Sequence, residues 1–148
     1  RKVMGTADCF ICEADLYISD LSIFDAELSR SCYYGKMVPG FSDDWVFDWD
    51  GERITRVGKE GTDRYNMVGV SYFKKADAAV IRDAIDAAYE KPGYEGLYWD
   101  EIVDRQLDKL NLDIHPVEKE QIVEIDSVAE LAVIDESYRE VLEKMQAE

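Results

Sequence analysis

Positive charge is scarce in this sequence. Its 148 residues include 17 lysines and arginines against 33 aspartates and glutamates, giving a net charge of −16. A nucleic-acid backbone is also an anion and would be repelled, so we expect no nucleic-acid partner and favour a small cationic ligand. The single histidine, His115, has no second histidine with which to build a metal site. We interpret it as a partly exposed polar residue.

Long hydrophobic runs are also missing. No stretch approaches the roughly 18 apolar residues that a membrane-spanning helix needs, and no segment has the pattern of a secretory leader. The three cysteines are an odd number without framework spacing. Cys9 and Cys12 have the spacing of a zinc or redox motif, but they lie in an apolar run that predicts a strand, where positions i and i+3 face opposite sides. We therefore expect free thiols in a cytoplasmic protein without a membrane partner.

The residues that are present suffice for a folded core, since 47% are hydrophobic and 11% aromatic. The length fits a single domain over 1–148. Apolar and β-branched runs predict strands over 8–14, 31–34, 44–49, 53–57, 66–73, 112–117 and 121–125. Helical spacing of apolar residues predicts helices over 76–90, 99–110 and 128–145, with a short helix or turn within 19–28.

Local signals support several of these elements. Asp50-Gly51 between two β-rich runs is a strong hairpin signal. Ser127 followed three residues later by Glu130 matches a capping box. The run at 8–14 ends in acidic residues, as expected for a buried parallel strand. Strands and helices joined partly by a hairpin and partly by crossovers predict an α/β domain with a mixed sheet, a β-hairpin insertion and flanking helices.

Two acidic segments are candidates for a metal site. Glu13-Ala14-Asp15 closes the first apolar strand, and carboxyl ends of strands are where open α/β sheets place ligands. A carboxylate there could hold Mg²⁺, or the segment could simply begin an acidic loop. Glu124 and Asp126 close another short β run. Asp126 could instead assist Ser127 in capping the next helix.

Aromatic and acidic residues also occur together, in the segment 97–101 and around Trp45 and Trp49. Aromatic faces beside carboxylates suit a quaternary ammonium, which cannot donate a hydrogen bond and is held by cation–π and Coulomb attraction. The alternative is that these rings serve packing, as most large aromatics do.

Five short motifs, taken in order, resemble the bacterial choline-phosphate cytidylyltransferases of the nucleoside-triphosphate (sugar nucleotidyl) transferase family. The resemblance covers nearly all of the chain. The matching segments are Glu13-Ala14-Asp15, Asp43-Asp44-Trp45, Gly69-Val70-Ser71-Tyr72, Leu97-Tyr98-Trp99-Asp100 and Glu124-Ile125-Asp126-Ser127.

The resemblance implies a Rossmann-like nucleotidyltransferase fold and cytidylyl transfer from CTP to phosphocholine or a related phosphoalcohol. The products would be CDP-choline, used to decorate surface glycans, and pyrophosphate. By the same resemblance, Asp15 and Asp126 would hold Mg²⁺. The residues implied to surround the choline headgroup are Trp45, Tyr98, Trp99, Asp100 and Glu124. No covalent nucleophile is required, and we assign no catalytic side chain.

The chain also departs from the family pattern. The glycine-rich loop of the family, with its following Arg and Lys, precedes the first acidic motif, and this chain begins only a few residues before that motif. We therefore expect the C-terminal portion of a nucleotidyltransferase domain, inactive alone and able to self-associate through an incomplete sheet. Glu13 stands where the family commonly has Asp, and the polar segment 63–66 has no assigned role.

Two other functions remain open from the sequence. One is nucleotidyl transfer to a sugar phosphate, although an aromatic and acidic pocket suits a cation better than sugar hydroxyls. The other is a non-catalytic domain that binds a cation or another protein through its acidic surface.

Overall fold

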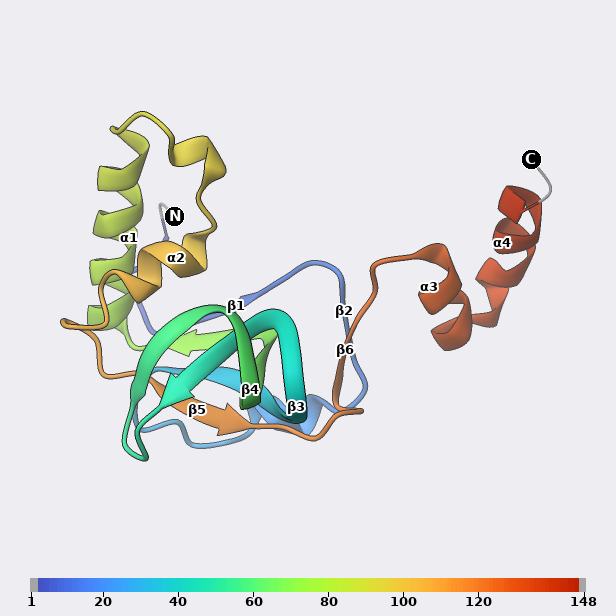
Figure 1. Ribbon diagram of the computed structural model, residues 1–148, viewed down its shortest axis with the longest axis horizontal. Coiled ribbons are helices and arrows are strands. Elements are labelled where there is room, and N and C mark those ends of the chain that lie inside the picture. Colours follow the sequence, from blue (N-terminus) through green and yellow to red (C-terminus); the bar gives the residue numbers. More distant parts are fainter. Residues whose placement is uncertain (1–2, 147–148) are drawn as a thin grey trace.

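A computed structural model describes residues 3–146, and Figure 1 shows a body of sheet and helices from which the last two helices stand apart. The body holds a four-stranded sheet in the order β1–β4–β3–β5, in which only the β3–β5 pair is parallel. Its strands are β1 (Cys9–Cys12), β3 (Cys32–Trp49), β4 (Ile54–Phe73) and β5 (Asp113–Pro116). The predicted mixed α/β fold is confirmed.

The hairpin formed by β3 and β4 dominates the sheet. As predicted, it turns at Asp50-Gly51, where the Asp50 carboxylate accepts hydrogen bonds from the backbone N–H groups of Glu52 and Arg53, each at 2.9 Å. The prediction of a short strand over 31–34 is wrong, because β3 continues through Pro39-Gly40 to Trp49. Irregular pairing between the two strands accommodates this passage, and Gly40 adopts a φ of +82°.

Strand β1 is also not the buried parallel strand that was predicted. It pairs antiparallel with β4 at the edge of the sheet, with Cys9 opposite Phe73. Its residues alternate between half-buried and exposed, because successive side chains of a strand point to opposite faces of the sheet.

Both faces of the sheet are covered by a core cluster. Successive residues of β3 point to opposite faces and therefore belong to different clusters. Tyr33 belongs to a core cluster with Phe47 and Phe73 beneath the helices, and the neighbouring Tyr34 belongs to a second cluster around Ile122. Helices α1 (Lys75–Tyr89) and α2 (Trp99–Asp104) lie over the first face (Figure 1). Two single-turn 3-10 helices, η1 (Leu21–Phe24) and η2 (Tyr94–Gly96), lie in the connections.

The helix predicted over 76–90 is confirmed, but the other two helices are shorter than predicted. Helix α2 ends at Asp104, whose carboxylate accepts a hydrogen bond from the backbone N–H of Val57 at 2.7 Å and so joins the helix end to β4. The predicted C-terminal helix divides at Asp135, which adopts an extended conformation and caps the next turn through Ser137. The resulting segments are α3 (Val128–Ile134), η3 (Glu136–Tyr138) and α4 (Arg139–Gln146).

A small antiparallel ribbon connects the body to these last helices. It consists of β2 (Leu16–Ile18) and β6 (Ile122–Glu124), with Leu16 opposite Glu124. The predicted cap at the start of α3 is present, since the Ser127 hydroxyl accepts a hydrogen bond from the backbone N–H of Glu130. The Glu130 carboxylate accepts from the backbone N–H of Asp126, one residue before the position that a capping box uses. Of the helices in residues 3–146, none is long and apolar enough to cross a membrane.

Candidate functional site: a carboxylate cluster beside an aromatic pair

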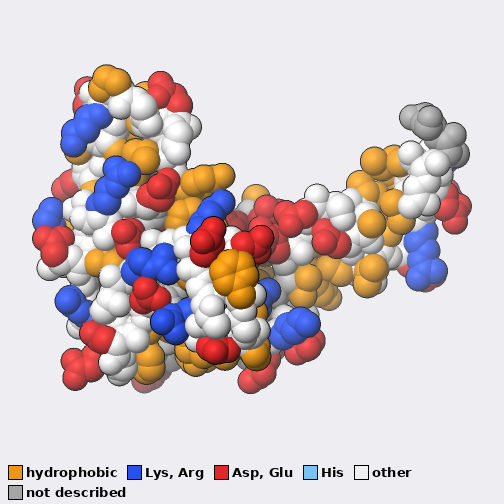
Figure 2. Space-filling model, viewed as in Figure 1, with side chains coloured by type: hydrophobic (Ala, Val, Ile, Leu, Met, Phe, Trp, Pro, Cys, Tyr) orange, Lys and Arg blue, Asp and Glu red, His pale blue; other side chains and the backbone are white. Residues whose placement is uncertain are grey.

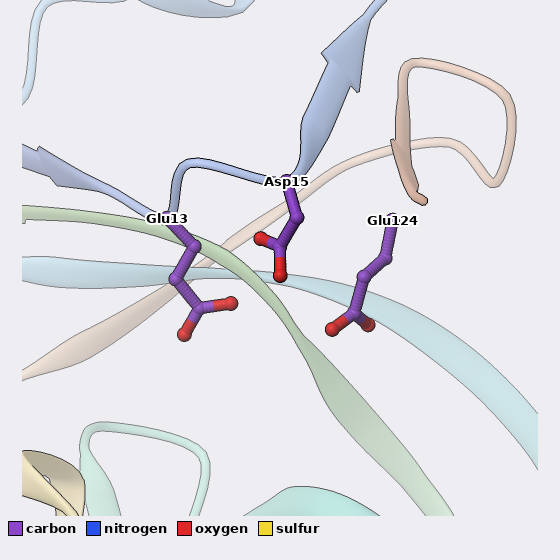
Figure 3. Close-up of side chains that lie close together, drawn as sticks. All are labelled: Glu13, Asp15 and Glu124. Atoms are coloured by element: carbon purple, nitrogen blue, oxygen red, sulfur yellow. The ribbon is translucent and has the colours of Figure 1, made fainter. Parts of the chain in front are cut away.

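Three carboxylates meet where the ribbon joins the main sheet. Glu13, Asp15 and Glu124 each place an oxygen within 4.8 Å of the others, and Figure 3 shows their side chains converging on one space. We call these three residues the carboxylate cluster. In Figure 2, acidic side chains gather on the surface where the body meets the segment leading to α3.

Backbone pairing brings these residues together from opposite ends of the sequence. The N–H of Glu13 donates to the carbonyl of Gly69 in β4 at 2.9 Å, which fixes Glu13 just beyond β1. The N–H of Ile125 donates to the carbonyl of Asp15 at 2.8 Å. Since β2 and β6 run antiparallel, Asp15 before β2 and Glu124 at the end of β6 lie at the same end of the ribbon.

Gly69 makes room for the carboxylate cluster. Its φ is +72°, and a Cβ built there would lie 2.7 Å from a carboxylate oxygen of Glu13 and 3.0 Å from a methyl carbon of Leu16. A side chain at this position would therefore displace Glu13 as well as strain the backbone.

Burial and neighbouring negative charges both raise pKa values within the cluster. Burial raises the pKa of Glu13, and the charges of Asp15 and Asp44 raise it further. Burial also raises the pKa of Glu124, followed by the charges of Asp126 and Asp44. Asp44 and Asp126 therefore extend the negative field around the three carboxylates. Such a site favours a cation, because a cation removes the repulsion.

The geometry of the cluster is compatible with Mg²⁺. Oxygens on opposite sides of an octahedral Mg²⁺ are about 4 Å apart, in the range over which these carboxylates meet. Of the predicted metal ligands, Asp15 lies in the cluster. Asp126 follows two residues after Glu124 and acts on it through its charge. Glu13 and Glu124 complete the three-residue group.

The second feature is an aromatic pair, Trp45 of β3 and Tyr98 just before α2. The two rings meet edge to face with centroids 5.5 Å apart, beside a groove of about 630 Å³. The ammonium of Lys59 lies over both rings, 5.7 Å from the Trp45 centroid and 5.3 Å from the Tyr98 centroid. Glu101, which also lines the groove, accepts a hydrogen bond from the backbone N–H of Tyr98 at 2.8 Å. The pair therefore already holds an ammonium group.

Asp100 lies close to the aromatic pair in sequence but is buried, at 4% exposure. Its carboxylate accepts a hydrogen bond from the Tyr33 hydroxyl at 2.8 Å. Burial raises its pKa to about 7, and the charge of Glu13 contributes to the same shift. Glu13 therefore connects Asp100 electrostatically to the carboxylate cluster. Trp99 packs on the core, with its ring 6.0 Å from that of Tyr33.

The structure thus brings together some of the predicted headgroup residues. Trp45 and Tyr98 are in contact, whereas Asp100 and Glu124 do not line the groove beside them. Sequence reasoning missed Lys59, which pairs with Trp45 across the β3–β4 hairpin. The hairpin signal predicted that the two strands would pair here. It could not predict which residues lie opposite each other, because the pairing is irregular.

A polar network within the segment 63–66 was also not predicted. The side-chain amide of Asn66 is buried and donates to the Ser42 hydroxyl at 2.7 Å and to the Asp44 carboxylate at 3.5 Å. Nearby, Arg64 pairs with Asp48 at 2.9 Å. The segment therefore positions Asp44, whose charge acts on the carboxylate cluster.

Comparisons with known proteins find cytidylyltransferases among the relatives of this chain. The chain is 52% identical over 137 residues to the 2-aminoethylphosphonate cytidylyltransferase of Lancefieldella rimae, covering 92% of the chain and 56% of that protein. It is 26% identical over 131 residues to the choline-phosphate cytidylyltransferase of Streptococcus pneumoniae, covering 88% of the chain and 57% of that protein. The chain is homologous to bacterial cytidylyltransferases. It spans a little more than half the length of these relatives, and no protein-family model matches it.

Solved structures give the same relationship. The structure of the CTP:phosphocholine cytidylyltransferase from Streptococcus pneumoniae superposes with a TM-score of 0.73 at 25% identity, over 88% of this chain and 57% of that one. A putative glucose-1-phosphate thymidylyltransferase from Bacillus anthracis superposes with a TM-score of 0.62 at 14% identity, over 93% and 57%. The second match shows a shared nucleotidyltransferase fold. The resemblance drawn from the five sequence motifs is confirmed.

The role of Gly69 can be tested with a matched glycine. Gly69→Ala and Gly40→Ala both place a side chain at a positive φ, but an added Cβ at Gly40 meets nothing within 4 Å. We expect each variant to lose about 1 kcal/mol of unfolding free energy in urea. Only Gly69→Ala should also weaken Mg²⁺ binding measured by calorimetry, because it displaces Glu13. Equal Mg²⁺ affinities in the two variants would contradict this role.

Asp100 gives a pH prediction. Its pKa is raised on folding to about 7, so its contribution to stability is present below its unfolded value and is lost as the pH rises through about 7. Asp100→Asn removes this ionisation and keeps an acceptor for Tyr33. At about pH 8 we expect the variant to be more stable than the parent by about 2 to 4 kcal/mol, with little difference at about pH 4. Asp108→Asn, at an exposed site, is the control for chemical denaturation at both pH values.

Proposed function

We propose that this chain forms the acceptor and metal-binding side of a cytidylyltransferase. The enzyme would transfer the cytidylyl group of CTP to a small phosphate or phosphonate that carries an ammonium group, releasing pyrophosphate. The observation that carries this proposal is the contact between the Lys59 ammonium and the rings of Trp45 and Tyr98. A surface that holds one ammonium in this way has the chemistry needed to hold another.

The first substrate we propose is 2-aminoethylphosphonate, and phosphocholine is the second. A primary ammonium needs hydrogen-bond acceptors in addition to aromatic faces, and carboxylates are abundant near the pair. A quaternary ammonium donates no hydrogen bond and is held by the aromatic faces and by the charge of nearby carboxylates. The 52% identical relative named for 2-aminoethylphosphonate supports this order. In this proposal, Glu101 and Asp104, which line the groove, supply the acceptors and negative charge for the headgroup. Asp100 and Glu124, which the sequence resemblance implied, lie outside the groove.

The carboxylate cluster is the proposed Mg²⁺ site. Asp15 and Asp126 are the ligands implied by the resemblance, and the meeting of Glu13, Asp15 and Glu124 adds two carboxylates to the candidates. When bound, Mg²⁺ supplies charge neutralisation for phosphate oxygens. These side chains would hold the ion, and the lack of a side chain at Gly69 leaves room for the Glu13 carboxylate.

Nucleotide binding is proposed to depend on a glycine-rich segment of the kind that the family carries. We assign no residue of this chain to the cytidine base. We therefore expect no pyrophosphate from CTP and 2-aminoethylphosphonate with the printed chain alone. Release is expected from a protein that carries this chain behind such a segment. Turnover by the printed chain alone would contradict this division of roles.

Substitutions in the aromatic pair test the acceptor site directly. Trp45→Ala or Tyr98→Ala should weaken phosphocholine binding by roughly tenfold, since each cation–π contact contributes about 0.5 to 2 kcal/mol. Mg²⁺ affinity should remain unchanged, because neither ring belongs to the carboxylate cluster. Trp49→Ala is the matched control, being an exposed tryptophan of β3 outside the groove. Calorimetric titration that finds the same affinity in all three variants would refute the proposed acceptor site.

A further inference from the structure

Lys59 occupies the surface on which a substrate ammonium is proposed to bind. Its Nζ lies 5.7 Å from the centroid of Trp45 and 5.3 Å from that of Tyr98. The residue lines the same groove of about 630 Å³ as both rings. Two ammonium groups cannot occupy the same aromatic faces, and at such short separation they repel each other. A substrate cation must therefore either avoid this pair or displace Lys59.

The backbone at Lys59 is held by hydrogen bonds, whereas its side chain is exposed. Lys59 lies opposite Trp45 in the β3–β4 hairpin, so the two side chains are cross-strand neighbours. The guanidinium of Arg56 donates to the carbonyl of Lys59 at 3.2 Å and to that of Glu60 at 2.9 Å. Arg56 is itself fixed by Asp48 at 2.8 Å. Displacement of the ammonium therefore requires only side-chain rotation.

The ammonium of Lys59 has no strong competing attachment. Within residues 3–146 it forms no ion pair with a carboxylate, and the side chain is exposed. Cation–π contacts at exposed sites are weak enough to exchange with a ligand that brings further contacts. The carboxylates around the site attract an incoming cation in addition to the rings. The position of Lys59 over the rings is thus reversible.

We propose that Lys59 is an internal competitor of the substrate, a specificity-determining residue whose ammonium covers the Trp45–Tyr98 pair until the substrate's ammonium displaces it. This inference rests on the proposed function, because it takes the aromatic pair as the acceptor site. It predicts that Lys59 lowers the affinity for every ammonium ligand. The loss is the same factor for each ligand that must displace Lys59. A ligand with only an aromatic contact is therefore left with weak binding, whereas one that also reaches the carboxylate cluster or Mg²⁺ is retained.

The test compares Lys59→Met with the parent chain. Methionine keeps an unbranched apolar stem and removes the charge, and Lys144→Met on α4 makes the same charge change away from the body. The probes are choline, which is a cation without a phosphate, and ethylphosphonate, which is an anion without an ammonium. We expect Lys59→Met to bind choline roughly three- to tenfold more tightly than the parent, the range expected from losing one or two weak cation–π contacts. Lys144→Met should match the parent.

Nuclear magnetic resonance gives a second measurement on the parent chain. The Hε resonances of Lys59, identified by their loss in Lys59→Met, should be shifted by the ring currents of Trp45 and Tyr98. They should move toward ordinary lysine values when choline is added.

Two results would overturn the inference while leaving the acceptor site intact. One is choline binding that is unchanged or weaker in Lys59→Met. The other is ethylphosphonate binding that depends on Lys59, which would make this lysine a contact for the phosphonate. Failure of choline to bind both the parent and Lys59→Met would instead overturn the proposed function, and the inference with it.

Discussion

Repulsion among carboxylates is the constraint on which the arrangement of this site depends. Glu13, Asp15 and Glu124 meet within 4.8 Å, and the charge of Asp44 acts on two of them. Without a restraint, the repulsion between these carboxylates would move them apart. Backbone hydrogen bonds hold them instead: Glu13 is tied to Gly69, and Asp15 is tied to Ile125. Burial first, and then the charges of the neighbouring carboxylates, raise the pKa of Glu13 and of Glu124.

Local signals were sufficient to predict much of the fold. Asp50-Gly51 predicted the turn of the hairpin because the aspartate satisfies the backbone N–H groups of the same turn. Ser127 predicted the start of α3 for the same kind of reason. The antiparallel placement of β1 depends on pairing with β4, more than fifty residues away, and nothing within 8–14 encodes that direction. The predicted C-terminal helix is interrupted at Asp135. An aspartate can either continue a helix or cap the next turn, and the local sequence does not decide between the two.

The candidate site shows the same limit. Motifs pointed to Asp15, Trp45 and Tyr98, because each lies in a short recognisable segment. The contact of Lys59 with two of these residues depends on strand register, and β3 and β4 pair irregularly around Trp45. Asp44 is positioned by Asn66, which lies in a segment that had no assigned role. These partners are separated in sequence, so only the assembled sheet reveals them.

The β2–β6 ribbon has a thermodynamic consequence. Glu13 and Glu124 are more than a hundred residues apart in the sequence, so an unfolded chain does not present them to one ion. A divalent cation that binds the assembled carboxylates would therefore cross-link two segments that are distant in the sequence. Its binding energy would add to folding stability according to its concentration. The melting temperature of the chain would then depend on the free Mg²⁺ concentration around it.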